Sequence, residues 1–350
     1  MRMVSELYES DLSAACKADL PWEKLNDKTV LITGAAGLIA ACLIDLLVQK
    51  NKEAGMNIKI LAAVRSQKRA ERCFSEYLSM PCFQLIEQDV TEPWRGAIVP
   101  DFIIHAASNA HPLAFSKDPV GTMNANYIGV ANLLELARKT NAKVLYLSSG
   151  EVYGLNNGID IFRETDCGPI DLLSPRSCYP SSKRAAETLC SAYHAQYGVD
   201  TVIARPCHIY GPTMTDSDSR VIAQFIRNAL KGEDIVMKSA GTQQRSMCYA
   251  VDCATALLTV LLKGNIVEAY NISDAESKIT IAELAKLIAE KADVKVRFEI
   301  PDAIESAGYN KVEHSVLSGE KLSALGWSPS VTLDEGIGRT IEILKAVKEW

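Results

Sequence analysis

The chain has 350 residues, of which 48% are hydrophobic, and a formal net charge of −6. This length and composition suffice for a large core, shared by two structural regions or built as one large domain with an embedded lobe. The negative charge argues against binding nucleic acid or anionic membranes through bulk charge, and no apolar window approaches the roughly 18 residues of a membrane span.

The cysteines and the N-terminal residues indicate the compartment. The ten cysteines form no CxxC pair and have no regular spacing, so neither a zinc site nor a disulfide framework is indicated. The first 25 residues mix acidic and basic side chains and lack the apolar core of a signal peptide. We therefore expect a cytoplasmic protein with reduced thiols and no metal.

Short apolar runs alternate with longer amphipathic stretches up to about residue 210. This alternation predicts βαβ units, and beyond it the pattern breaks into loops, short strands and helices. The predicted fold class is α/β, with a Rossmann-type doubly wound parallel sheet and a smaller C-terminal mixed α/β lobe. The predicted regions are an N-terminal leader (1–27), a dinucleotide-binding domain (28–210) and a lobe that binds mainly substrate (211–350), from which segments can return to the sheet.

A glycine-rich turn follows the first predicted strand. Residues 30–33 run into Gly34-Ala-Ala-Gly37, and a helix follows from Leu38 and Ile39. Gly34 would permit the tight turn, Gly37 would let the backbone approach a pyrophosphate, and the helix N-terminus would supply N–H groups and positive dipole. Such a pattern also occurs as a simple tight turn, but the strand before it and the helix after it favour dinucleotide binding.

The second predicted strand ends in a basic cluster. Arg65, Lys68 and Arg69 follow the apolar run 58–64. An acidic residue here would accept hydrogen bonds from a ribose 2′-hydroxyl, whereas basic residues pair with a 2′-phosphate. The cluster favours NADP over NAD, with a solvated basic loop as the alternative.

Two further motifs predict proton-transfer chemistry. Ser149 and Glu151 follow a predicted strand, and Tyr179 and Lys183 lie four residues apart at the start of a helix. The ammonium can therefore lie beside the phenol and lower its pKa from about 10 by favouring the phenolate. Ser149 could hydrogen-bond a substrate hydroxyl and share its proton with Tyr179 as the base.

Together these motifs resemble the extended short-chain dehydrogenase/reductase family of nucleotide-sugar epimerases, dehydratases and decarboxylases. The resemblance covers nearly the whole chain after the leader, through residues 105–108, the helix around Asn126, and the segments 148–154, 179–183, 205–212, 245–252 and 321–342. It implies an enzyme that removes a hydride from carbon 4 of a nucleotide-diphosphate sugar and usually returns it. Helices at 124–139 and 178–198 resemble the family's dimer-forming bundle, which implies a homodimer.

The resemblance also assigns residues to sites. The expected cofactor ligands are Gly34, Gly37, Leu38, Ile39, Arg65, Asp89, Val90, Ala106, Ala107, Tyr179 and Lys183. The expected catalytic residues are Ser149, Glu151, Tyr179 and Lys183, and the expected substrate ligands are Ser108, His208, Arg220 and Arg245. A guanidinium matches phosphate oxygens, so either arginine could hold the diphosphate or instead form a surface ion pair.

Glu151 and Gly150 bear on the reaction. Similar epimerases carry a small or neutral residue where this chain has Glu151, whereas decarboxylases and 4,6-dehydratases carry Glu. Dehydratases place Asp where this chain has Gly150, and the segments 175–184 and 218–230 resemble those of UDP-glucuronate decarboxylases. A structural role for Glu151, as a carboxylate that caps its loop, is the alternative to catalysis.

The favoured reaction is therefore decarboxylation of a nucleoside-diphosphate uronate, which becomes a β-keto acid once carbon 4 is oxidised. The alternatives are a 4,6-dehydratase, a 4-epimerase, an NADPH-dependent ketosugar reductase and a non-enzymatic dinucleotide sensor. Three departures from the family leave substrate and cofactor open: His208 replaces the usual Asn, Arg65 replaces the usual acid, and Gly150 replaces a polar group.

Overall fold

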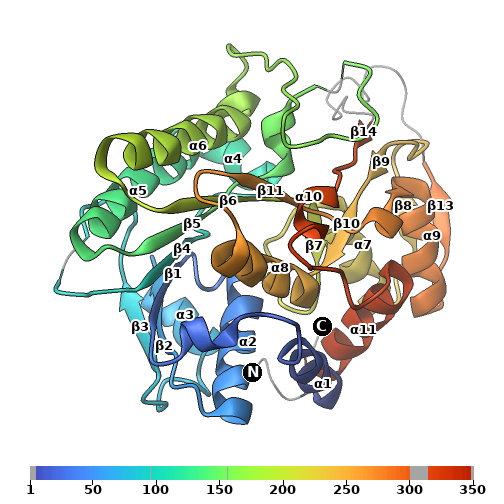
Figure 1. Ribbon diagram of the computed structural model, residues 1–350. Helices are drawn as coiled ribbons and strands as arrows, with labels where there is room; N and C mark the ends of the chain where they lie inside the picture. The colour runs from blue at the N-terminus through green and yellow to red at the C-terminus, as the bar shows by residue number, and fades with distance from the viewer. Residues whose placement is uncertain (1–4, 95, 156, 300–313, 348–350) are drawn as a thin grey trace.

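The centre of the molecule is a seven-stranded parallel sheet in the order β11-β6-β5-β4-β1-β2-β3 (Figure 1). The computed structural model describes residues 5–94, 96–155, 157–299 and 314–347. The strands are β1 (Thr29–Thr33), β2 (Lys59–Val64), β3 (Phe83–Glu87), β4 (Phe102–His105), β5 (Lys143–Leu147), β6 (Thr201–Pro206) and β11 (Ala269–Ile272). Their short apolar sequences fit a parallel sheet that is covered on both faces.

The order of the strands reverses beside β1. The chain runs outward through β2 and β3, then returns to place β4 on the other side of β1. Thr33, the last residue of β1, therefore lies opposite both Ala63 of β2 and His105 of β4. In such sheets ligands bind at the carboxyl ends of the strands where the order reverses.

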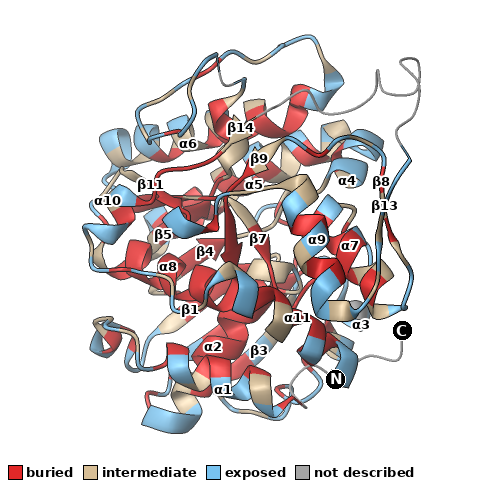
Figure 2. Ribbon diagram, turned by 90° about the vertical axis from the view of Figure 1, so that its right-hand side faces the viewer, coloured by how far each residue is buried: buried red, intermediate tan, exposed pale blue. Residues whose placement is uncertain are grey.

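Helices cover both faces of the sheet (Figure 1). α2 (Leu38–Ala54) and α8 (Ala250–Lys263) share one apolar core, and α5 (Pro119–Thr140) and α6 (Cys178–Tyr197) share the other. Figure 2 shows that buried residues are concentrated in the sheet and on the sides of the helices that face it. No helix in the described ranges is long and apolar enough to cross a membrane.

The remaining residues form the smaller lobe. A parallel pair, β7 (His208–Tyr210) and β10 (Met247–Tyr249), leads from the large sheet into it. The other elements are α7 (Val221–Leu230), β8 (Ile235–Met237), β9 (Gln244–Arg245), β12 (Ile279–Thr280), α9 (Ile281–Ala292), β13 (Val296–Phe298), β14 (His314–Ser315), α10 (Glu320–Ser323) and α11 (Leu333–Val347). Because α8 and β11 lie beyond residue 210 yet complete the large sheet layer, the chain passes between the two regions more than once.

The N-terminal residues pack onto this core. Residues 6–15, within the segment expected to be a polar leader, form α1 (Glu6–Ala15). The Tyr8 hydroxyl donates to Asp45 of α2 at 2.9 Å. Asp11 accepts a hydrogen bond from Tyr249 at 2.8 Å and forms an ion pair with Arg339 of α11. Helix α1 therefore joins the cofactor half of the fold to the smaller lobe.

Candidate active site

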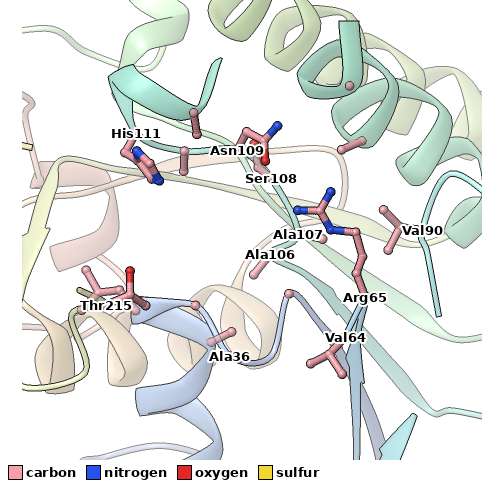
Figure 3. Close-up of a pocket in the computed structure, with 18 of the residues that line it drawn as sticks. Ala36, Val64, Arg65, Val90, Ala106, Ala107, Ser108, Asn109, His111 and Thr215 are labelled. Carbon is pink, nitrogen blue, oxygen red and sulfur yellow. The ribbon is translucent and has the colours of Figure 1, made fainter. Parts of the chain in front are cut away.

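A cavity of about 620 Å³ opens at the carboxyl edge of the sheet where the strand order reverses (Figure 3). Its walls come from the segments that follow β1, β2, β3 and β4, and from residues 215–220 of the smaller lobe. Most of the expected cofactor ligands line it: Gly34, Gly37, Leu38, Ile39, Arg65, Asp89, Val90, Ala106 and Ala107. Residues that are far apart in the sequence thus share one concave surface.

The turn after β1 is built for close approach. Gly34 has φ +63°, and a Cβ added there would lie 2.7 Å from the backbone of Ala107. Gly37 is the N-cap of α2, and no side chain caps this helix. The first amides of an uncapped helix suit a phosphate. Ser108 also lines the cavity, and its buried hydroxyl has no hydrogen-bond partner among the described residues. The glycine turn and the uncapped helix therefore fit a dinucleotide.

Arg65 lies at the end of β2, in the wall of this cavity (Figure 3). Its neighbour Asp89 accepts hydrogen bonds from the backbone N–H and the hydroxyl of Thr91 at 2.9 and 2.8 Å. Burial alone would raise the pKa of Asp89, but these bonds and the Arg65 charge together lower it below its usual value. Asp89 is therefore an anion, and a cofactor 2′-phosphate would have to share the Arg65 guanidinium with it.

The expected catalytic residues come together at the end of β5. The Ser149 hydroxyl lies close enough to the Tyr179 phenol to lower its pKa. The Lys183 ammonium donates to Leu147 O at 2.7 Å and lies 5.7 Å from the centroid of the Tyr179 ring. Tyr179 and Lys183 are buried, with 6% and 3% of their surfaces exposed. Because Leu147 also lines the cavity, this cluster adjoins the proposed cofactor surface.

The protein alone does not lower the phenol pKa as the Tyr-Lys spacing led us to expect. Burial and, to a smaller extent, the Glu151 charge raise the pKa of Tyr179 to about 12, although the Ser149 hydroxyl acts in the opposite direction. Burial also lowers the pKa of Lys183 to about 7. Removing either group from water disfavours its charged form, which the spacing of the two residues does not reveal.

The Glu151 carboxylate pairs with Arg176, a contact that the sequence did not predict. Both carboxylate oxygens lie 2.9 Å from the same guanidinium nitrogen of Arg176. Arg176 covers the Phe115 ring at 4.5 Å, and that ring stacks on Tyr179 with centroids 5.4 Å apart. The loop itself is capped by the Ser149 hydroxyl, which accepts from the Glu151 N–H at 3.1 Å. Glu151 is thus linked to the phenol through Arg176 and Phe115.

The expected substrate ligands differ in their surroundings. Arg220 lines the cavity, and it forms an ion pair with Asp218 at 2.6 Å and donates to Ile209 O at 2.8 Å. Arg245 is buried on β9 and His208 lies on β7. Burial and the charges of these two arginines lower the pKa of His208 to about 3. His208 is therefore a neutral imidazole near both guanidinium groups.

His111 also lines the cavity, between the two regions (Figure 3). It precedes α4 (Pro112–Lys117), and its Nδ1 lies 3.0 Å from the hydroxyl of Ser219 in the smaller lobe. The same hydroxyl accepts a hydrogen bond from the Leu113 N–H at 3.1 Å. The segment that carries Phe115 is thus connected to the smaller lobe.

Residues 30–273 match the sequence pattern of the NAD dependent epimerase/dehydratase family. The chain belongs to this family. It is 34% identical to UDP-glucuronic acid decarboxylase 6 of Arabidopsis thaliana over 314 residues, which are 89% of this chain and 87% of that protein. It is also 34% identical to UDP-glucuronic acid decarboxylase 1 of Danio rerio over 315 residues, which are 90% of this chain and 72% of that protein.

Solved structures of other members of the epimerase/dehydratase family share the fold. The UDP-glucose 4-epimerase of Thermotoga maritima with UDP-glucose superposes with a TM-score of 0.76 at 24% identity, covering 92% of this chain and 100% of that one. A dTDP-glucose 4,6-dehydratase of Bacillus anthracis in complex with NAD gives 0.76 at 21% identity, covering 92% and 98%. The predicted fold class, the family and an enzyme that uses a nicotinamide cofactor are confirmed. The roles of individual residues stay predictions.

The close approach at Gly34 predicts a selective effect of Gly34→Ala. Gly55 is a matched control, because its φ is also +63° but a Cβ added there would meet no atom within 4 Å. Gly55→Ala should cost about 1–2 kcal/mol from backbone strain alone. Gly34→Ala should cost more and weaken NAD binding, because the methyl group overlaps Ala107. Urea denaturation and calorimetric titration with NAD measure both effects, and equal behaviour of the two variants would contradict this account.

Proposed function

We propose that the protein decarboxylates a nucleoside-diphosphate uronate after transient oxidation at carbon 4 of the sugar. The arrangement that carries this proposal is Glu151 beside the Ser149, Tyr179 and Lys183 cluster, with Gly150 as its neighbour. The relatives named UDP-glucuronic acid decarboxylases, which align over about nine-tenths of the chain, support the same choice.

The proposed reaction needs a hydride acceptor, a base and a group that stabilises the deprotonated base. A bound nicotinamide cofactor would supply the acceptor for the hydride of carbon 4 and, after carbon dioxide has left, the donor that returns it. Tyr179 takes the proton of the carbon 4 hydroxyl, with Ser149 in hydrogen-bonding contact, and a charged Lys183 favours the phenolate that this requires. With a ketone at carbon 4 the uronate is a β-keto acid, so loss of carbon dioxide needs little more than a proton donor at carbon 5.

The surroundings of Gly150 support decarboxylation over 4,6-dehydration. A Cβ at this position would lie 3.0 Å from the Leu317 side chain and 3.5 Å from Pro206 O. An acid placed there to protonate a leaving hydroxyl would press against a Leu317 methyl group, which would have to shift to make room. The remaining acid beside Tyr179 is Glu151, which is engaged by Arg176. A 4-epimerase and a 4,6-dehydratase, the activities named for the structural neighbours, are the alternative outcomes of the test.

The test is NMR analysis of the products formed from UDP-glucuronate, UDP-glucose and dTDP-glucose. We expect carbon dioxide and a pentose nucleotide from UDP-glucuronate, and no product from UDP-glucose or dTDP-glucose. Tyr179→Phe should bind NAD normally and lose roughly 10²–10⁴-fold in turnover, whereas Tyr197→Phe, at the exposed end of the same helix, should be unaffected. A 4-keto-6-deoxy product or simple inversion at carbon 4 from the unmodified enzyme would overturn the proposal, as would near-normal turnover by Tyr179→Phe.

We further propose that the cofactor is NADP. The proposal is supported by Arg65, an exposed cation in the cavity wall at the end of β2. Calorimetry should show NADP binding more tightly than NAD. Arg65→Asp should reverse this preference, since one charge-assisted contact is worth about 1.5–3 kcal/mol. Lys59→Asp, at the opposite end of the same strand, is the control that should leave the preference intact. Equal or tighter binding of NAD by the unmodified protein would refute it.

We also propose a homodimer formed through α5 and α6. These helices pack together on one face of the sheet, and α5 exposes apolar side chains, namely Val120, Met123, Tyr127 and Ile128. Sedimentation at micromolar concentration should show a dimer, and Met123→Glu with Ile128→Glu should give a folded monomer. A monomeric unmodified protein under the same conditions would exclude this interface.

A further inference from the structure

A buried hydrogen-bond network lies beside the catalytic cluster, around Glu187 of α6. Oε1 of Glu187 accepts from the Ser148 hydroxyl at 2.5 Å and from Arg205 Nε at 3.0 Å. Oε2 accepts from Arg205 Nη2 at 2.6 Å. The Glu187 and Arg205 side chains are only 12% and 13% exposed. A fork-to-fork pair of this kind fixes the orientation of the carboxylate as well as its position.

Arg205 is itself held in place by the segment that follows β5. Its Nη1 donates to the Tyr153 hydroxyl at 3.0 Å and to Glu164 O at 2.9 Å. The Tyr153 hydroxyl donates in turn to Asn271 of β11 at 2.6 Å. The Glu187 carboxylate is therefore tied to the ends of β5 and β6 and, through Tyr153, to β11, and it cannot turn away without breaking several buried bonds.

Lys183 lies one helical turn before Glu187, on the same side of α6. Its ammonium donates to a neutral carbonyl, Leu147 O, and it forms no ion pair within the part of the chain that the structure describes. The Tyr146 ring of β5 lies 4.9 Å away and the Tyr179 ring 5.7 Å away. A buried ammonium in such neutral surroundings tends to lose its proton.

We propose that Glu187 is a positioning residue for the catalytic lysine: its fixed carboxylate supplies the negative charge that keeps the buried Lys183 protonated. This inference rests on the proposed proton transfer at Tyr179, because that step needs a charged Lys183. It gives a chemical role to a network that would otherwise serve only to connect α6 to the sheet.

The other titratable groups around Lys183 do not supply this charge. Burial and the Lys183 charge lower the pKa of His105 on β4 to about 3, so its imidazole is neutral. Burial raises the pKa of Tyr146 well above its usual value and that of Tyr179 to about 12, so both phenols are neutral. Burial lowers the pKa of Lys183 to about 7, and the charge that opposes burial is that of Glu187.

The direct test is NMR titration of Lys183 in protein labelled with [6-¹³C]lysine, assigned by the signal missing from Lys183→Met. Glu187→Gln should move the midpoint to lower pH by about one unit, the smaller end of the effect of a nearby opposite charge. Glu187→Asp, which keeps the charge, should move it less. Glu135→Gln is the matched control, since Glu135 lies on α5 and bonds Arg138 and Tyr193, and it should leave the midpoint unchanged.

A purely structural role would reduce thermal stability without moving this midpoint. If Glu187→Gln does not fold, the double variant Glu187→Leu with Arg205→Met removes both charges together, a change that buried ion pairs often tolerate. It should still move the midpoint to lower pH, but by less, because the Arg205 charge that partly offsets Glu187 is removed as well. An unchanged Lys183 midpoint in either folded variant overturns the inference.

Turnover of UDP-glucuronate gives a second readout. Because the active form carries a charged Lys183, activity falls as pH rises through the Lys183 midpoint, and Glu187→Gln should move this fall to lower pH by the same amount. A shifted NMR midpoint in a protein that turns over no nucleotide sugar would reject the proposed function but support the Glu187–Lys183 coupling. An unshifted midpoint in an active enzyme would reject the coupling alone.

Discussion

The bond from the Lys183 ammonium to Leu147 O is the contact on which the arrangement of the proposed catalytic residues depends. It ties the first turns of α6 to the carboxyl end of β5 at 2.7 Å. That position places Tyr179 close to Ser149, the second residue after β5. It also removes a cation from water, so the surrounding protein must supply a fixed negative charge for the ammonium to persist.

A second constraint is the contact between the loops that follow β1 and β4. Gly34 approaches Ala107 so closely that no side chain fits between them. The Thr33 hydroxyl and His105 Nδ1, 2.7 Å apart at the ends of the same two strands, hold this edge together from below. Because β1 and β4 lie at the reversal in strand order, the loops that follow them separate at the carboxyl edge of the sheet, and the cavity opens between them. The cofactor surface therefore follows from topology together with one glycine.

Two ion pairs near Tyr179 differ in burial, and that difference suits them to different tasks. The Glu187–Arg205 pair is almost fully enclosed, and removing one partner of such a pair leaves an uncompensated charge. The Glu151–Arg176 pair has side chains 39% and 41% exposed. An exposed pair holds its partners weakly. The buried pair therefore fixes the geometry of its two side chains more firmly than the exposed pair does.

The sequence by itself determined the features that depend on local spacing. The alternation of short apolar runs and helical periods predicted the parallel sheet, the Gly34 turn predicted the cavity edge, and the separation of Tyr179 and Lys183 predicted their common helix face. Each is a property of neighbouring residues, which strand and helix geometry convert directly into position.

Only the tertiary structure decided what depends on burial and on contacts between distant segments. It raised the Tyr179 pKa where the spacing had suggested a lower one, joined Glu151 to Arg176 and Phe115 to Tyr179, and packed α1 against α2 and α11. It also enclosed Glu187 with Arg205, residues 18 positions apart. Solvent exclusion and the meeting of separate elements set these properties, and no local pattern in the chain records either one.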